Sequence, residues 1–128
     1  MAARPRPLSP HLQIYRFTLT MALSIVHRGT GMAMYFGTLL IVLWLGAAAL
    51  GDGPLGVVNA IFGFWLVQVI WFFATWALFQ HMLGGLRHFV WDSGNFLDPA
   101  GRELIVRINL GLSIVLTLGA WAIFVWFK

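Results

Sequence analysis

The chain contains no cysteine among its 128 residues. It therefore forms no disulfide, holds no iron–sulfur cluster through cysteines of its own and attaches no c-type haem covalently. Charge is scarce as well, because Asp, Glu, Lys and Arg make up only 9% of the residues, against about 25% in soluble domains. Hydrophobic residues make up 60% of the chain, and the mean hydropathy is +0.85. This composition predicts an integral membrane protein.

Acidic residues are the rarest charged group, with four against eight Lys and Arg, which gives a net charge of +4. A basic chain can bind nucleic acid, but these arginines form no dense patch. They flank long apolar segments instead, which is typical of charges that orient a membrane protein. We therefore expect membrane lipid, and no nucleic acid, around this chain.

The N-terminus lacks the continuous apolar run and the cleavage site of a secretory signal, and it resembles a transit peptide only faintly. We expect a multi-pass protein of the bacterial inner (cytoplasmic) membrane rather than of a mitochondrion. Residues 1–16 carry Pro5, Pro7 and Pro10, so this cytoplasmic arm is expected to be extended.

Three apolar segments follow, and each is long enough for one crossing of the hydrocarbon core, which takes about 20 helical residues. Backbone groups in lipid must be satisfied internally, so the segments are expected to be helices. The predicted fold is an all-α membrane protein, a single domain over residues 1–128 with three transmembrane helices at about 20–50, 57–88 and 104–127. Glycine-rich residues 50–56 and polar residues 92–103 are the expected connections.

The arginines are distributed unevenly about these helices. The first predicted connection has no Lys or Arg, whereas cations surround the first helix and the second connection: Arg4, Arg6, Arg16, Arg28, Arg87, Arg102 and Arg107. The positive-inside rule then puts the N-terminus and the second connection in the cytoplasm and the C-terminus in the periplasm. Lys128, at the C-terminus, is the one cation that opposes this orientation.

Ser24, His27, Arg28 and Gly31 are spaced i, i+3, i+4 and i+7 within the first apolar segment, so they are expected on one helical face. Arg28 either extends to the membrane interface or pairs with an anion or polar ligand. Ser24 and Gly31 alone would indicate close helix packing. The four together favour a polar pocket.

His81, Gly84, Gly85 and His88 repeat the same spacing in the second segment, within HMLGGLRHFVWD. The glycine pair either marks a tight helix contact or lets a flat ring lie against the backbone. His81 either binds a ligand or forms a hydrogen bond with a neighbouring helix.

The two polar faces are predicted to lie at the same depth, toward the cytoplasm. Imidazole is a common axial ligand of haem iron, and haem propionates need cationic or hydrogen-bonding partners. Iron at His81 with propionates toward His27 and Arg28 fits the pattern. A quinone with donors from Ser24 and Arg28 fits it too.

Two segments resemble the cytochrome b membrane-anchor subunit of succinate dehydrogenase, respiratory complex II. The first, residues 6–31, has an Arg-Pro opening followed by Ser-x-x-His-Arg-x-Thr, and the second, residues 81–94, has His-x-x-x-Gly-x-Arg-His followed by Asp. Together they cover about a third of the chain, and its length and three-helix layout agree with the family over the rest.

The resemblance implies a role for each motif residue. His81 would be this chain's axial ligand to haem b, and a second small anchor subunit would supply the other. His27 and Arg28 would approach the haem propionates, while Ser24 and Arg28 would line the ubiquinone site. His88 and Asp92 match the motif without a defined role.

The resemblance also implies partners. An iron–sulfur subunit and a flavoprotein subunit would dock on the cytoplasmic face, succinate would be oxidised in the flavoprotein, and electrons would reach ubiquinone at the anchor. One alternative is a non-redox subunit of a transporter, or an assembly factor, that uses Arg28 and His81 for proton or substrate contact. Another is the anchor of a fumarate reductase.

Overall fold

The computed structural model describes residues 14–127, and within that range it is helical, with no strand. The helices are α1 (Leu19–Leu50), α2 (Asp52–Gly63), α3 (Trp65–Asp92) and α4 (Pro99–Trp126). The expected extended arm lies almost wholly outside the described residues, as do Arg4, Arg6 and Lys128. Three helices, α1, α3 and α4, are long and apolar enough to cross a membrane. The all-α prediction with three membrane-spanning helices is confirmed.

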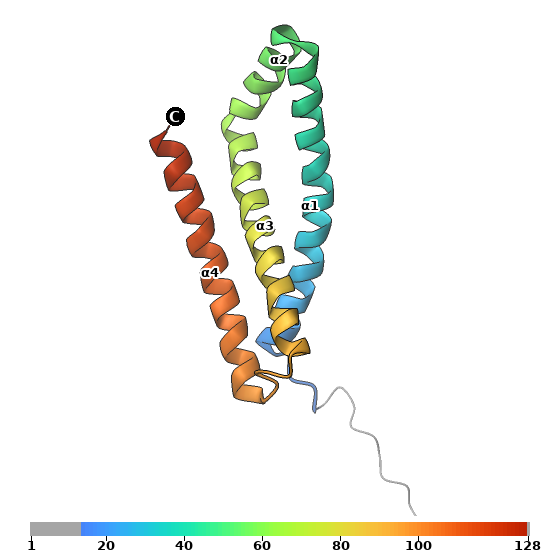
Figure 1. The fold of residues 1–128 in the computed structure, drawn as a ribbon, viewed down its shortest axis with the longest axis vertical. Coiled ribbons are helices and arrows are strands. Elements are labelled where there is room, and N and C mark those ends of the chain that lie inside the picture. The colour runs from blue at the N-terminus through green and yellow to red at the C-terminus, as the bar shows by residue number, and fades with distance from the viewer. Residues whose placement is uncertain (1–13, 128) are drawn as a thin grey trace, which may run out of the picture.

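The three long helices lie side by side with α3 between α1 and α4 (Figure 1). The start of α1, the end of α3 and the start of α4 lie at one end of the molecule. The short helix α2 lies at the other end, next to α1, and the C-terminal end of α4 points the same way. We call these the loop end and the α2 end.

The second apolar segment is two helices instead of the single helix expected over about 57–88. α2 ends at Gly63, Phe64 is extended with φ −66° and ψ 134°, and α3 starts at Trp65. Glycine is a poor helix former, and Gln68 makes the break tolerable because its side-chain amide donates to the carbonyl oxygen of Phe62. A carbonyl freed within a membrane needs such an internal partner.

The connections are shorter than expected. Gly51, with φ 105°, is the turn between α1 and α2, and Pro54 falls in the first turn of α2, where its missing N–H breaks no helical bond. α4 begins at Pro99 rather than near residue 104. Its N-cap is Asp98, whose Oδ2 accepts the N–H of Gly101 at 2.9 Å.

Polar groups gather between α3 and α4. On α4, Asn109, Ser113 and Thr117 are spaced four apart and are buried, which is the small and polar packing stripe expected between membrane helices. Gln80 of α3 donates to Oδ1 of Asn109 at 2.9 Å, and nearer the α2 end the indole N–H of Trp121 donates to Thr75 at 3.2 Å.

Large apolar side chains point outward along all the long helices. Dispersion and hydrogen bonds between helices, rather than burial of a hydrophobic core, therefore hold this fold, as expected for helices whose surroundings are as apolar as their own side chains.

Candidate functional site

The two predicted polar faces meet at the loop end, between α1 and α3. The rings of His27 and His81 stack with their centroids 4.1 Å apart and their planes 4° from parallel. The ring of His88 lies 5.7 Å from that of His27. The structure therefore brings all three predicted histidines together, two from α3 and one from α1.

Two glycines make this stack geometrically feasible. A Cβ at Gly31 would stand 2.9 Å from Cε1 of His81, and a Cβ at Gly84 would overlap the ring of His27. Each histidine thus lies over a glycine of the facing helix. The neighbouring Gly85 has open space around it, so of the glycine pair only Gly84 forms the helix contact.

The ring of His81 is held by a hydrogen bond that its Nδ1 donates to α1. Its Nδ1 lies 3.1 Å from the main-chain carbonyl oxygen of His27. The hydroxyl of Thr30, which donates to the same carbonyl at 3.0 Å, lies 3.5 Å from Nδ1. A carbonyl oxygen only accepts, so Nδ1 carries the proton and, in the neutral ring, the lone pair is on Nε2. That atom makes no hydrogen bond within the described chain and is not fully enclosed.

His27 offers an unused polar atom at the same place. Its Nδ1 is buried and has no hydrogen-bond partner within residues 14–127. A buried polar atom without a partner is costly and so marks a place where a further group is expected to bind. The environment at the stack thus combines an available imidazole lone pair, an unpaired ring nitrogen and a glycine-lined seam.

Ser24 and Arg28 lie on the adjacent outer face of α1. Both are exposed, and no hydrogen bond or ion pair joins either to another described residue. They flank His27 along the helix, so they border the stack without being part of it. Asp92, the last residue of α3, is exposed and lies one helical turn beyond His88.

Arg87 shares the depth of the histidines but faces a different helix. It is only 4% exposed and lies with Asn109 along the seam between α3 and α4. Its guanidinium carbon is 4.9 Å from the centroid of the Trp91 ring, a cation–π contact, while Nε and Nη1 lack a partner among the described residues. The sequence predicted the depth of Arg87 in the membrane but not that its side chain is buried.

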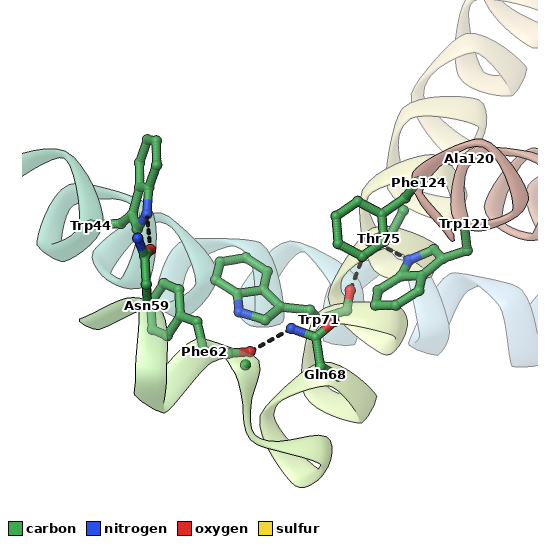
Figure 2. A pocket seen from close by; sticks show the side chains of 10 residues that line it. Trp44, Asn59, Phe62, Gln68, Trp71, Thr75, Ala120, Trp121 and Phe124 are labelled. Atoms are coloured by element: carbon green, nitrogen blue, oxygen red, sulfur yellow. Dashed lines mark hydrogen bonds between the residues drawn. The ribbon is translucent and has the colours of Figure 1, made fainter. Parts of the chain in front are cut away.

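A cavity of about 500 Å³ lies at the α2 end, away from the histidines (Figure 2). Its polar groups largely bond to each other: Trp44 donates to Asn59 at 3.0 Å, Gln68 donates to the carbonyl of Phe62, and Trp121 donates to Thr75. Sequence reasoning did not predict this cavity, which exists because the break at Phe64 turns α2 away from the line of α3. No residue singled out as a site residue lines it.

Residues 2–120 match the family described as succinate dehydrogenase/fumarate reductase transmembrane subunit. The chain belongs to this family.

The relatives named here are cytochrome b subunits of succinate dehydrogenase. The chain is 38% identical over 113 residues to the succinate dehydrogenase cytochrome b556 subunit of Paracoccus denitrificans, covering 88% of this chain and 87% of the relative. It is also 38% identical over 125 residues to the cytochrome b560 subunit of Reclinomonas americana, covering 93% and 86%. The pig mitochondrial cytochrome b560 subunit is 40% identical over 98 residues, covering 72% and 56%. The resemblance inferred from the two motifs is confirmed, because over most of its length this chain is similar to proteins named as cytochrome b subunits of succinate dehydrogenase.

Proposed function

We propose that this anchor subunit binds haem b and helps to form the site at which ubiquinone is reduced with electrons from succinate. The observation that carries the proposal is the state of His81, whose Nδ1 is engaged by the His27 carbonyl while Nε2 makes no hydrogen bond within residues 14–127 and is not enclosed. The similarity to relatives named cytochrome b subunits supports the same cofactor.

His81 is the residue of this chain that would bind the haem iron. A metal-binding histidine usually donates its other ring N–H to a carbonyl or carboxylate, which fixes the tautomer and the ring orientation. His81 has that arrangement, because its Nδ1 faces the main-chain carbonyl oxygen of His27. When bound, haem b supplies a one-electron redox centre whose potential depends on its axial ligands and surroundings.

The second axial ligand would come from the second membrane-anchor subunit. The lone pair of an imidazole lies in the plane of its ring, so two opposed ligands need ring planes that share a line through the iron. The rings of His27 and His81 are parallel and stacked, and therefore share no such line. His88 belongs to the same helix as His81, which keeps it from the opposite face of a haem.

His27 and Arg28 would hold the haem propionates. The imidazole of His27 and the exposed guanidinium of Arg28, which makes no ion pair within residues 14–127, are a donor set suited to carboxylates. Ser24 and Arg28, exposed and one turn apart, would donate to a carbonyl oxygen of ubiquinone. His88 and Asp92 lie one turn apart at the end of α3, and we assign them no separate step.

We place the chain in the inner membrane of a bacterium, and the arginine distribution supports a cytoplasmic loop end and a periplasmic α2 end. The iron–sulfur subunit and the flavoprotein subunit would then dock at the loop end, next to the histidines. Succinate would be oxidised in the flavoprotein, and this chain would complete the path of electrons to ubiquinone.

The test is a reduced-minus-oxidised optical spectrum of the purified complex, with haem quantified per protein. We expect b-type haem in the wild type, its loss or an altered spectrum in His81→Ala, and retention in His88→Ala, the matched change two turns along the same helix. A wild-type complex without haem, or a His81→Ala complex with the wild-type spectrum, would refute the haem assignment. The non-redox alternative predicts no stoichiometric haem, and membership of this family does not favour it.

A further inference from the structure

We propose that the α1 segment from His27 to Gly31 is a positioning element for His81, which sets the orientation and tautomer of that ring so that Nε2 faces the haem. The inference rests on the proposed function, because it assumes that His81 binds iron. It adds a role for a main-chain carbonyl, for Thr30 and for Gly31, none of which would touch the iron.

The first component is the main-chain carbonyl of His27. It is 3.1 Å from Nδ1 of His81 and requires a proton on that nitrogen. A main-chain acceptor is fixed by its helix, and it therefore holds the distant ring more rigidly than a mobile side chain would. Because it accepts from the ring, it also strengthens Nε2 as a donor to a metal ion.

The second component is Thr30, which is 5% exposed. Its hydroxyl donates to the carbonyl of His27 at 3.0 Å and lies 3.5 Å from Nδ1 of His81. A threonine hydroxyl bonded to the carbonyl three residues earlier is common within helices. Here the shared carbonyl is also the acceptor for His81, so the hydroxyl is a second, longer acceptor for Nδ1 and restricts where the ring settles.

The third component is the absence of a side chain at Gly31. A Cβ there would lie 2.9 Å from Cε1 and 3.3 Å from Nδ1 of His81, both closer than ordinary contact distances. An alanine would push the imidazole away from α1 and lengthen the bond between Nδ1 and the His27 carbonyl. Gly31 is therefore the position at which a small change disturbs the ligand ring most directly.

The chain offers a matched control for this change. Gly29 lies on the same helix two residues earlier, and a Cβ built there meets nothing within 4 Å. Gly29→Ala thus makes the same chemical change in α1 without reaching His81. Within the described residues, the contact with His81 is what a Cβ at Gly31 adds and a Cβ at Gly29 does not.

The experiment measures haem content, the midpoint potential of the haem and its low-spin EPR g-values in the assembled complex. We expect Gly31→Ala to weaken haem retention roughly 10- to 100-fold, the usual effect of disturbing a partner of a metal ligand, and to displace the g-values. A tenfold change in the relative affinity for the two oxidation states would appear as a shift of about 59 mV in midpoint potential. Gly29→Ala should match the wild type in all three measurements.

A second pair of variants does not depend on accommodating extra volume. Thr30→Val removes the hydroxyl at nearly constant size, and Thr30→Ser keeps it. We expect Thr30→Val to displace the midpoint potential of the haem and Thr30→Ser to keep the wild-type value. If the Gly31→Ala complex fails to assemble, this pair of variants tests the positioning role by itself.

The outcomes separate the two proposals. If His81→Ala loses the haem while Gly31→Ala and Thr30→Val keep wild-type potential and g-values, the positioning role is overturned and the haem assignment stands. If His81→Ala keeps the wild-type spectrum, both fall together.

Discussion

Two neighbouring glycines of α3 should respond in opposite ways to the same substitution. A Cβ at Gly84 would overlap the ring of His27, coming within 3.0 Å of Cε1 and 3.3 Å of Cγ, and that ring cannot easily retreat because it is stacked on His81. Overpacking of this kind costs about 1–3 kcal/mol. Alanine recovers about 0.8–1.0 kcal/mol of helix propensity relative to glycine. Gly84→Ala is therefore expected to destabilise the protein by about 0–2 kcal/mol.

At Gly85 the same propensity gain applies, but a Cβ there meets nothing within 4 Å. Gly85→Ala should leave the protein unchanged or stabilise it by up to about 1 kcal/mol. The propensity contribution cancels when the two variants are compared, so the difference between them isolates the contact with His27 at about 1–3 kcal/mol.

The assay is unfolding of the assembled complex in mixed micelles by titration with a denaturing detergent, with both variants measured beside the wild type. The comparison between adjacent residues of one helix avoids assigning an absolute stability to a complex of several chains, whose unfolding need not be two-state. Equal stabilities for Gly84→Ala and Gly85→Ala, within about 0.5 kcal/mol, would refute the ring-over-glycine packing. So would a larger loss for Gly85→Ala, because a partner chain would then occupy the space beside it.

Two further predictions concern other parts of the chain. Gln80→Leu and Asn109→Leu should each destabilise the protein by about 1–3 kcal/mol, because each leaves the buried amide of the other without a partner. The double variant should cost less than the sum by about 0.6–1.7 kcal/mol, and an additive double-mutant cycle would contradict this. Arg28→Leu should raise the KM for ubiquinone roughly 10- to 100-fold, from the loss of one charged hydrogen bond, while succinate oxidation with a soluble dye acceptor stays unchanged. Arg107→Leu, which removes an exposed cation paired with Glu103, is the matched control and should leave that KM unaltered.

The membrane-spanning character of the chain was predictable because it follows from composition and length alone. A stretch of about 20 apolar residues has few alternatives to a helix in lipid. The same reasoning did not find the break at Phe64, since no proline marks it. The side-chain amide of Gln68 satisfies the carbonyl oxygen of Phe62 that the break leaves free. This contact depends on the path of the chain rather than on any local periodicity.

The start of α4 shows a signal that was present but interpreted differently. Asp98-Pro99 lies in a polar segment that was expected to be a loop. It is also a typical helix start, with an acidic N-cap followed by proline at the first helical position. The structure uses it in that way, and α4 therefore begins about five residues before the predicted bound.

The histidine face was predictable to the level of helical spacing and no further. Spacing of i, i+3, i+4 and i+7 put His81, Gly84 and His88 on one face. Which glycine meets which ring depends on how far α1 and α3 slide past each other, and helical periodicity within one segment carries no information on that. Arg87 differs, because six residues from His81 correspond to an angle of about 120° around the helix. The spacing alone could therefore have predicted that Arg87 faces a different helix from His81. In the structure Arg87 lies beside α4.

The two sides of α3 explain why the site lies where it does. Toward α4, the unpaired atoms of Arg87 and Asn109 are enclosed by apolar side chains, so that seam mainly holds the helices together. Toward α1, glycines replace side chains, the helices approach closely and Nε2 of His81 is left accessible at the edge of the seam. A ligand ring needs rigid support on one side and an open lone pair on the other. The α1–α3 seam at the loop end provides both, because a carbonyl of α1 holds Nδ1 of His81 while Nε2 stays free.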